Sequence, residues 1–96
     1  MKKYSYTILE WIEITDIEDI SYYPPLNEKV MIYVHRPISQ FNKKDEKFIS
    51  QSRLVLMDMG DNTRYTIPER LNWEALFFSF DKYYVKAWAY FDYPKF

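Results

Sequence analysis

Several carboxylates near the N-terminus could carry out chemistry, namely Glu10, Glu13, Asp16, Glu18 and Asp19. Two such groups can act as general acid and base in hydrolysis, or can hold a hard cation such as Ca²⁺. Their spacing matches no calcium-binding loop, and no glycine lies among them to form the sharp turn of such a loop. A solvent-exposed acidic face is therefore the favoured interpretation. A hydrolase that uses these carboxylates ranks third among the functions considered.

Other catalytic side-chain types are scarce. His35 is the only histidine and there is no cysteine, which excludes multi-histidine metal sites, thiolate zinc sites, cysteine nucleophiles and disulfides. We expect His35 to lie at a strand end or in a loop and not to act as a catalytic base. The segment 58–62 looks like the start of a metal loop but lacks its regular oxygen spacing, so a turn is predicted. We expect no enzyme activity, no cofactor and no metal site.

A mixture of basic and aromatic residues in the second half of the chain could bind nucleic acid. Such strands can stack bases on their rings while cations hold phosphates. The residues concerned are Arg53, Arg64, Arg70, Lys82 and Lys86, with Tyr65, Trp73, Tyr83, Tyr84 and Trp88. Acidic residues occupy the same region, and the chain carries 13 basic and 14 acidic residues, which leaves no general field to attract an anion. A nucleic-acid or nucleotide-binding module is therefore the second-ranked function.

The elements that must position these residues belong to one small domain, 1–96. The chain has 96 residues, of which 21% are aromatic, so it holds enough apolar area for one core. Its single glycine, Gly60, rules out glycine-rich phosphate loops and flexible linkers. No apolar run approaches the roughly 20 residues of a membrane span, and the N-terminus lacks the apolar stretch of a signal peptide. We expect a soluble, unprocessed protein in the cytoplasm.

Alternating apolar and polar residues predict a small twisted antiparallel sheet. The strands are expected at 4–14, with a break near 9–11, and then at 29–34, 48–59, 75–80 and 83–91. A helical turn is expected at 16–20, a solvated hairpin tip at 35–47, and tight turns at 60–62 and 81–82. Thr66 and Glu69 have capping-box spacing around Pro68, which predicts one short helix near 67–74. The fold class is α+β leaning towards all-β.

The C-terminal strand is the richest in aromatic residues and gives the candidate partner-binding site. In a regular strand one of its faces carries Tyr84, Lys86, Trp88 and Tyr90. Tyrosine and tryptophan dominate interface hot spots because they offer a large contact area at low entropic cost. For Trp88 itself, burial against the helix near 67–74 is favoured over exposure to a partner.

Three segments give the chain a family resemblance: "WIEI" at 11–14, "YYPPLNEKVMIYV" at 22–34 and "VKAWAYFDYP" at 85–94. The chain resembles a family of short phage and prophage proteins of unknown function. These begin Trp-Ile-Ser-Val, pass through a proline to a Val-Leu-Val-Tyr strand, and end near Thr-His-Trp-Met-Pro-Leu-Pro. The positions that match are Trp11, Ile12, Val30, Ile32, Tyr33, Trp88 and Pro94.

The chain also departs from the family pattern. Lys86 and Ala87 stand where the family has Thr-His, Tyr90 replaces the first C-terminal proline, and 36–82 has no counterpart. The resemblance implies a small β-rich fold and a phage origin, and it carries over no activity.

Composition and resemblance together predict a non-enzymatic, phage-encoded interaction protein. It would bind a host or phage protein through an aromatic and charged surface, in the cytoplasm of the host cell. A counter-defence or host-takeover role follows from the resemblance alone. Because a short sheet has two edges and this chain has few edge-protecting residues, we also expect a homodimer at micromolar concentration.

Overall fold

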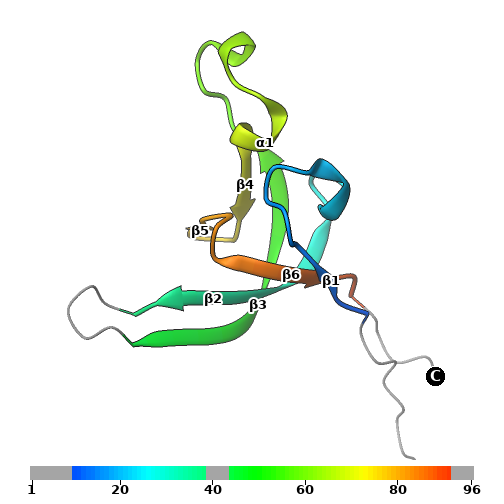
Figure 1. Ribbon diagram of the computed structural model, residues 1–96, viewed down its shortest axis with the longest axis vertical. Helices are drawn as coiled ribbons and strands as arrows, with labels where there is room; N and C mark the ends of the chain where they lie inside the picture. The colour runs from blue at the N-terminus through cyan, green and yellow to red at the C-terminus, as the bar shows by residue number, and fades with distance from the viewer. Residues whose placement is uncertain (1–9, 39–43, 92–96) are drawn as a thin grey trace, which may run out of the picture.

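A computed structural model describes residues 10–38 and 44–91, and within them the chain forms a six-stranded antiparallel sheet (Figure 1). Its strand order is β1-β6-β2-β3-β4-β5. The strands are β1 (Ile12–Glu13), β2 (Lys29–Pro37), β3 (Asp45–Leu56), β4 (Leu71–Glu74), β5 (Ser79–Phe80) and β6 (Val85–Ala89). The helical pieces are short: η1 (Ile20–Tyr22), η2 (Asn62–Arg64) and α1 (Ile67–Arg70). The predicted fold class, α+β leaning towards all-β, is confirmed.

Strand β2 lies at the centre of the sheet, between β6 and β3, where its sequence predicted it. Val30, Ile32 and Val34 are fully buried on one face, which we call the inner face, while Met31 and Tyr33 are half-buried on the outer face. The strand continues to Pro37, which pairs with Asp45 of β3. The predicted hairpin tip at 35–47 is therefore too long, because its ends extend the two strands; residues 39–43 lie outside the described residues.

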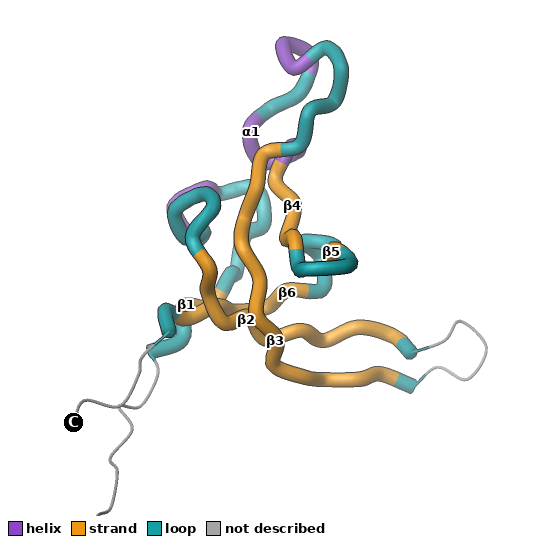
Figure 2. Tube along the Cα trace, turned by 180° about the vertical axis from the view of Figure 1, so that it is seen from behind, coloured by secondary structure: helices purple, strands orange, loops and turns teal. Residues whose placement is uncertain are grey.

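Strand β3 joins the two halves of the sheet. Its first part pairs with β2 as far as Arg53, and its last part, Arg53 to Leu56, pairs with β4. The strand bends between these parts, so the sheet curls over its own inner face (Figures 1 and 2). Apolar side chains from both halves meet there and form the core: Ile14, Tyr23, Val30, Ile32, Val34, Leu54, Leu71, Trp73, Phe80, Val85 and Trp88.

Helix α1 is shorter than predicted. Its capping box is present, since the Thr66 hydroxyl accepts from the Glu69 amide and the Glu69 carboxylate accepts from the Thr66 amide. The helix ends at Arg70, and β4 follows at once. The predicted helical segment 71–74 is therefore wrong, because pairing with β3 buries Leu71 and Trp73 on alternate positions of a strand.

The turns follow their local chemistry, with one correction. Gly60 has a φ of 85°, the left-handed conformation expected of a turn glycine. The Tyr84 amide donates to the Asp81 carbonyl, which confirms the tight turn before β6. The predicted strand at 75–80 is reduced to β5, because the Ala75 amide donates to the Phe78 carbonyl and closes a hairpin turn at 75–78.

The N-terminal segment is described from residue 10 onwards. Only β1 is a strand there, and the predicted strand at 4–8 lies outside the described residues. The helical turn expected at 16–20 falls slightly later, as η1, with Asp19 as its N-cap. No helix in the described part of the chain is long and apolar enough to cross a membrane.

Candidate protein-binding surface

Strand β6 does not have the regular alternation that the sequence predicted for it. Val85 pairs with Val34 of β2, whereas Ala87 pairs with Tyr33, so the register shifts by one residue at Lys86. This β-bulge places both Val85 and Trp88 on the inner face, although they are three positions apart. The predicted partner-binding face, with Tyr84, Lys86, Trp88 and Tyr90 side by side, therefore does not form as one surface.

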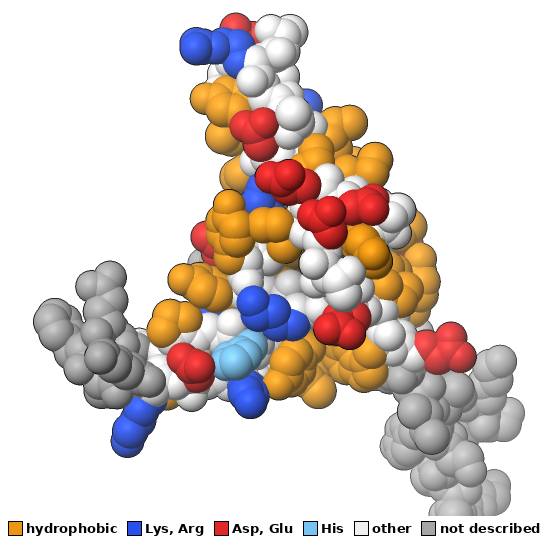
Figure 3. All heavy atoms as spheres, in the orientation of Figure 1, with side chains coloured by type: hydrophobic (Ala, Val, Ile, Leu, Met, Phe, Trp, Pro, Cys, Tyr) orange, Lys and Arg blue, Asp and Glu red, His pale blue; other side chains and the backbone are white. Residues whose placement is uncertain are grey.

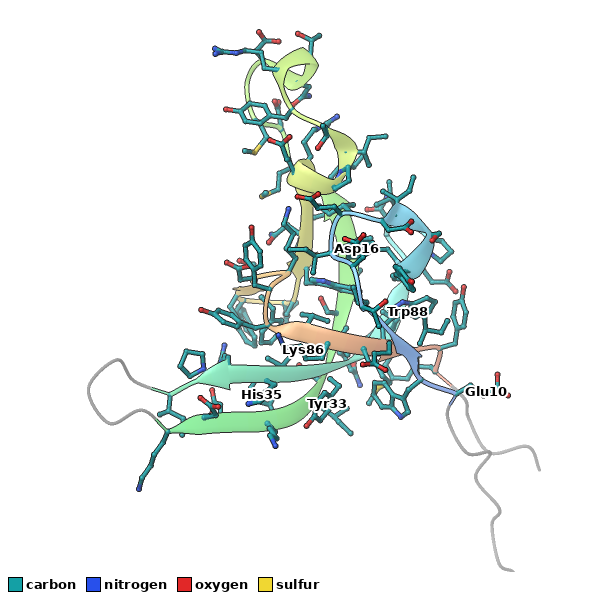
Figure 4. All side chains as sticks on the ribbon, in the orientation of Figure 1. Glu10, Asp16, Tyr33, His35, Lys86 and Trp88 are labelled. Atoms are coloured by element: carbon teal, nitrogen blue, oxygen red, sulfur yellow. The ribbon has the colours of Figure 1, made fainter. Side chains whose placement is uncertain are left out.

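Trp88 belongs to the core. Its side chain is 3% exposed, and its Nε1 donates to the Tyr22 carbonyl over 2.6 Å. The Tyr90 ring stands edge-on against it, with centroids 5.0 Å apart. The predicted burial of Trp88 is confirmed, but the indole lies against η1 and not against the helix near 67–74 (Figure 4).

Tyr84 and Lys86 lie instead beside a shallow groove of about 230 Å³ at the start of β6. The groove is also lined by His35, Arg36, Pro37, Asp45 and Tyr83. Figure 4 shows Lys86 and His35 on the neighbouring strands β6 and β2. The structure thus brings half of the predicted site to one place and adds residues from the β2–β3 hairpin.

Two side-chain contacts and one hydrogen bond to the backbone hold the polar groups of this groove. His35 Nε2 lies 3.1 Å from Asp45 Oδ2, and Arg36 Nε donates to Glu46 Oε1 over 2.6 Å. The Lys86 ammonium donates to the Tyr83 carbonyl over 2.6 Å. Because Asp45 and Glu46 lie among the basic groups, this mixture of charges and tyrosine rings suits a protein surface better than it suits a phosphate.

The hairpin between β4 and β5 carries an apolar tip that the sequence did not indicate. Leu76 and Phe77 are 86% and 87% exposed, and Phe78 is 55% exposed. The run "ALFFSF" at 75–80 suggested a buried strand because its apolar residues are consecutive. We call the side chains of Leu76, Phe77 and Phe78 the apolar tip.

The apolar tip and the groove are connected by ring contacts through Phe80, which is itself buried. The Phe78 ring stands edge-on to Phe80 at 5.0 Å, and Phe80 lies 5.8 Å from the Phe48 ring. The Arg36 guanidinium lies over both Phe48 and Phe80, at 4.9 and 5.6 Å from their centroids. Arg36 therefore connects the two regions, and Figure 3 shows hydrophobic side chains close to the histidine and its basic neighbours.

The residues considered for nucleic-acid binding lie only partly together: Tyr83, Tyr84 and Lys86 line the groove, and the Lys82 ammonium lies 6.0 Å from the Tyr83 ring centroid. Arg53 pairs with Glu74 at 3.3 Å, Arg70 Nε donates to the Met57 carbonyl, and Lys82 donates to the Pro68 carbonyl. Of the rings that were to stack bases, Trp73 and Trp88 are buried in the core. Two of the five candidate rings are therefore not available to stack bases, which keeps nucleic-acid binding second to protein binding.

Two of the five N-terminal carboxylates, those of Asp16 and Asp19, cap turns. Asp16 accepts from the Glu18 amide, and Asp19 accepts from both the amide and the hydroxyl of Ser21. The Ser21 bonds lower the pKa of Asp19 below its ordinary value. Glu10 and Asp16 lie well apart (Figure 4), and the described residues include no group of three or more His, Cys, Asp or Glu side chains that could hold a metal ion.

The predicted turn at 58–62 is confirmed by its own side chains. Asp58 accepts from the Gly60 amide, and Asp61 accepts from the Thr63 amide. Both carboxylates therefore accept hydrogen bonds from the backbone of the turn and stabilise it.

A second hollow, of about 460 Å³, lies between α1 and the loop before β6. Two of the charged groups along it have partners in the chain, since Glu69 completes the capping box and Lys82 donates to the Pro68 carbonyl; Glu18 also lines the hollow.

Comparisons with protein-family models, curated proteins and solved structures find no match to this chain. The resemblance to the phage and prophage family thus stays a prediction.

Proposed function

We propose that this protein is a non-enzymatic interaction module that binds another protein through the apolar tip and the adjoining groove. The observation that carries the proposal is the exposure of Leu76 and Phe77, at 86% and 87%. Keeping such side chains in water forgoes about 1.5–3 kcal/mol each relative to burial. Single exposed apolar residues are common, but a contiguous apolar patch with a polar rim is typical of an interaction site.

The shape of the surface indicates what the partner offers. A hairpin tip is convex, so its side chains fit an apolar pocket on the partner, which would remove Leu76 and Phe77 from water. The Arg36–Glu46 ion pair would form part of the polar rim of such an interface, because the Arg36 guanidinium lies over the Phe80 ring that Phe78 contacts. Tyr83 and Tyr84 extend the contact area towards β6.

The partner is assigned to a host or phage protein on the basis of the family resemblance. A phage-encoded module without catalytic residues acts by occupying a surface of its target. Counter-defence or host takeover in the host cytoplasm is the role that fits such an activity. This part of the proposal stands on Trp11, Val30, Trp88 and the other matching positions, and is independent of the tip geometry.

The proposal is tested with a double variant of the tip. Wild-type protein, Leu76→Ser/Phe77→Ser and the control Ile20→Ser are each immobilised and incubated with host lysate. Ile20 is a suitable control because it is 54% exposed and lies on η1, away from the tip. We expect one stoichiometric protein to bind the wild type and the control but not the double variant.

The captured protein is then purified, and its affinity for the three forms is measured by calorimetry. We expect the double variant to bind at least tenfold more weakly than the wild type. Equal retention of the partner by all three forms would remove the tip from the interface. Retention of nucleic acid in place of a protein would favour the second-ranked function.

A further inference from the structure

The exposed edges of the sheet differ in how well they are protected. Strands β1 and β5, at the two ends of the sheet, are only two residues long in the part of the chain described. The edge of β2 beyond its pairing with β6 is also protected, because the His35 amide donates to the Tyr84 carbonyl and Pro37 has no amide hydrogen. Short strands and proline are the usual protection of sheet edges.

The outer edge of β3 is neither short nor broken by a proline over residues 45–51, and Lys47 is the edge-protecting type of residue that it carries. Strand β4 pairs with β3 only from Arg53 to Leu56, and its chain turns back after Glu74. The Ser52 hydroxyl, on the inner face, donates to the Glu74 carbonyl, so β4 departs from β3 towards that face. Figures 1 and 2 agree that no strand lies along the outer edge of β3 in the β2–β3 hairpin.

The hydrogen-bond pattern identifies which backbone groups point outwards along this edge. The Ile38 amide donates to the Lys44 carbonyl, and in an antiparallel pair bonded and non-bonded residue pairs alternate. The pairs Pro37–Asp45, His35–Lys47, Tyr33–Ile49 and Met31–Gln51 are therefore non-bonded pairs. The amides and carbonyls of Asp45, Lys47, Ile49 and Gln51 thus point away from β2, and the described residues supply no backbone partner for them.

We propose that this edge of β3 binds the same edge of a second copy of the chain, as an antiparallel pair about a twofold axis at Phe48. In this register Asp45 lies opposite Gln51 of the second copy, and Lys47 lies opposite its Ile49. All the outward backbone groups then gain partners, over a length of roughly 20 Å. The two sheets join into one continuous sheet, and the added strand ends before Arg53, where β4 begins to pair.

Side-chain chemistry favours a second copy as the occupant. No like charges lie directly opposite each other in this register, since Asp45 faces a glutamine and Lys47 faces an isoleucine. Ile49 is 54% exposed on the outer face and would be partly covered by the second copy. A pair of strands this short buries less area than a standard interface, so we expect a dissociation constant on the order of 10–100 μM.

The test uses a proline where the fold does not need an amide. Ile49→Pro removes an amide that points away from β2, which proline at a sheet edge can do without breaking the sheet. The control Ile49→Thr keeps the amide and is a good strand former. We expect sedimentation equilibrium from 5 to 300 μM (on the order of the expected dissociation constant) to show a dimer for the wild type and for Ile49→Thr. In Ile49→Pro the dimer should be at least tenfold weaker.

Two further measurements keep the test decisive if Ile49→Pro unfolds. Lys47→Thr removes the charge at the middle of the edge and should tighten the dimer by threefold or more. Amide exchange of the wild type should slow with protein concentration at Lys47 and Ile49 and not at their neighbours Phe48 and Ser50, which already face β2.

A wild type that stays monomeric throughout this concentration range would overturn the proposal. A dimer that persists in a folded Ile49→Pro variant would also overturn it. The same holds if Leu76→Ser/Phe77→Ser abolishes the dimer and Ile49→Pro does not, because the interface would then lie at the apolar tip. Binding of an unrelated extended peptide by a monomeric wild type would assign the edge to a different occupant.

Discussion

Replacing Trp88 by alanine should be among the most damaging single changes in this protein. The side chain is 3% exposed, and its indole N–H donates to the Tyr22 carbonyl over 2.6 Å. Removing it leaves a cavity between β6 and η1 and a carbonyl without its donor. Large aromatic-to-alanine changes in cores cost about 3–5 kcal/mol, a large part of the 5–15 kcal/mol by which small domains are stable. At about 4 °C or more per kcal/mol, the melting temperature should fall by at least about 12 °C.

Urea unfolding followed by circular dichroism measures this loss, with surface variants as controls. Tyr90→Ala should cost only about 0.5–1.5 kcal/mol, because it removes an edge-on ring contact from a half-exposed side chain. Tyr84→Ala, at the groove, should cost no more than that. If Trp88→Ala unfolds within about 1 kcal/mol of wild type, the indole is not a core residue and our account of β6 is wrong.

A matched pair of phenylalanine variants isolates the hydrogen bond of Trp88. Trp73→Phe and Trp88→Phe remove the same atoms from two buried side chains. The indole N–H of Trp73 has no acceptor among the described residues, whereas that of Trp88 bonds to Tyr22. Trp88→Phe should therefore be the more destabilising by about 1–2 kcal/mol, and the opposite order would contradict the assigned bond.

Three further predictions concern pH, capping and nucleic acid. Burial, together with the charge of Asp16, raises the pKa of Tyr23 from 10.0 to about 12, so the unfolded chain ionises this tyrosine first. In pH-dependent urea melts, the free energy of unfolding of wild type relative to Tyr23→Phe should therefore be constant below pH 10 and fall as the pH rises towards 12. Thr66→Ala should lower the free energy of unfolding by about 0.5–2 kcal/mol through loss of the α1 cap, whereas Thr63→Ala, outside α1, should not shorten that helix in amide exchange. Fluorescence anisotropy with single-stranded DNA should give no salt-sensitive binding at micromolar protein, and a steep loss of binding with added salt would instead support the nucleic-acid alternative.

Local patterns in the sequence were enough to predict several elements. Val30, Ile32 and Val34 alternate with less apolar neighbours and specify β2. Thr66 and Glu69 specify the start of α1, because a capping box needs only residues of one helical turn. The end of α1 could not be predicted in the same way. Leu71 and Trp73 fit a helix as well as a strand, and pairing with β3 decides between them.

The candidate site was predicted less well because it depends on contacts between distant segments. The bulge at Lys86 turns Trp88 inwards, and no residue near it marks such a shift in the sequence. The exposure of Phe77 depends on where β4 turns back, which a run of apolar residues does not show. Tyr84 and Lys86 were selected correctly as surface residues, but their neighbours His35 and Arg36 come from a strand far away along the chain.

Site-specific photocrosslinking tests the proposed function most directly. A benzophenone analogue of phenylalanine is placed at Phe77, where an aromatic ring already stands 87% exposed, and in a second protein at Ile20, which is 54% exposed on η1. After illumination in the host cell, we expect one protein to be crosslinked from position 77 and not from position 20. No crosslink from position 77, or the same products from both positions, would contradict the proposal that the apolar tip binds a protein partner.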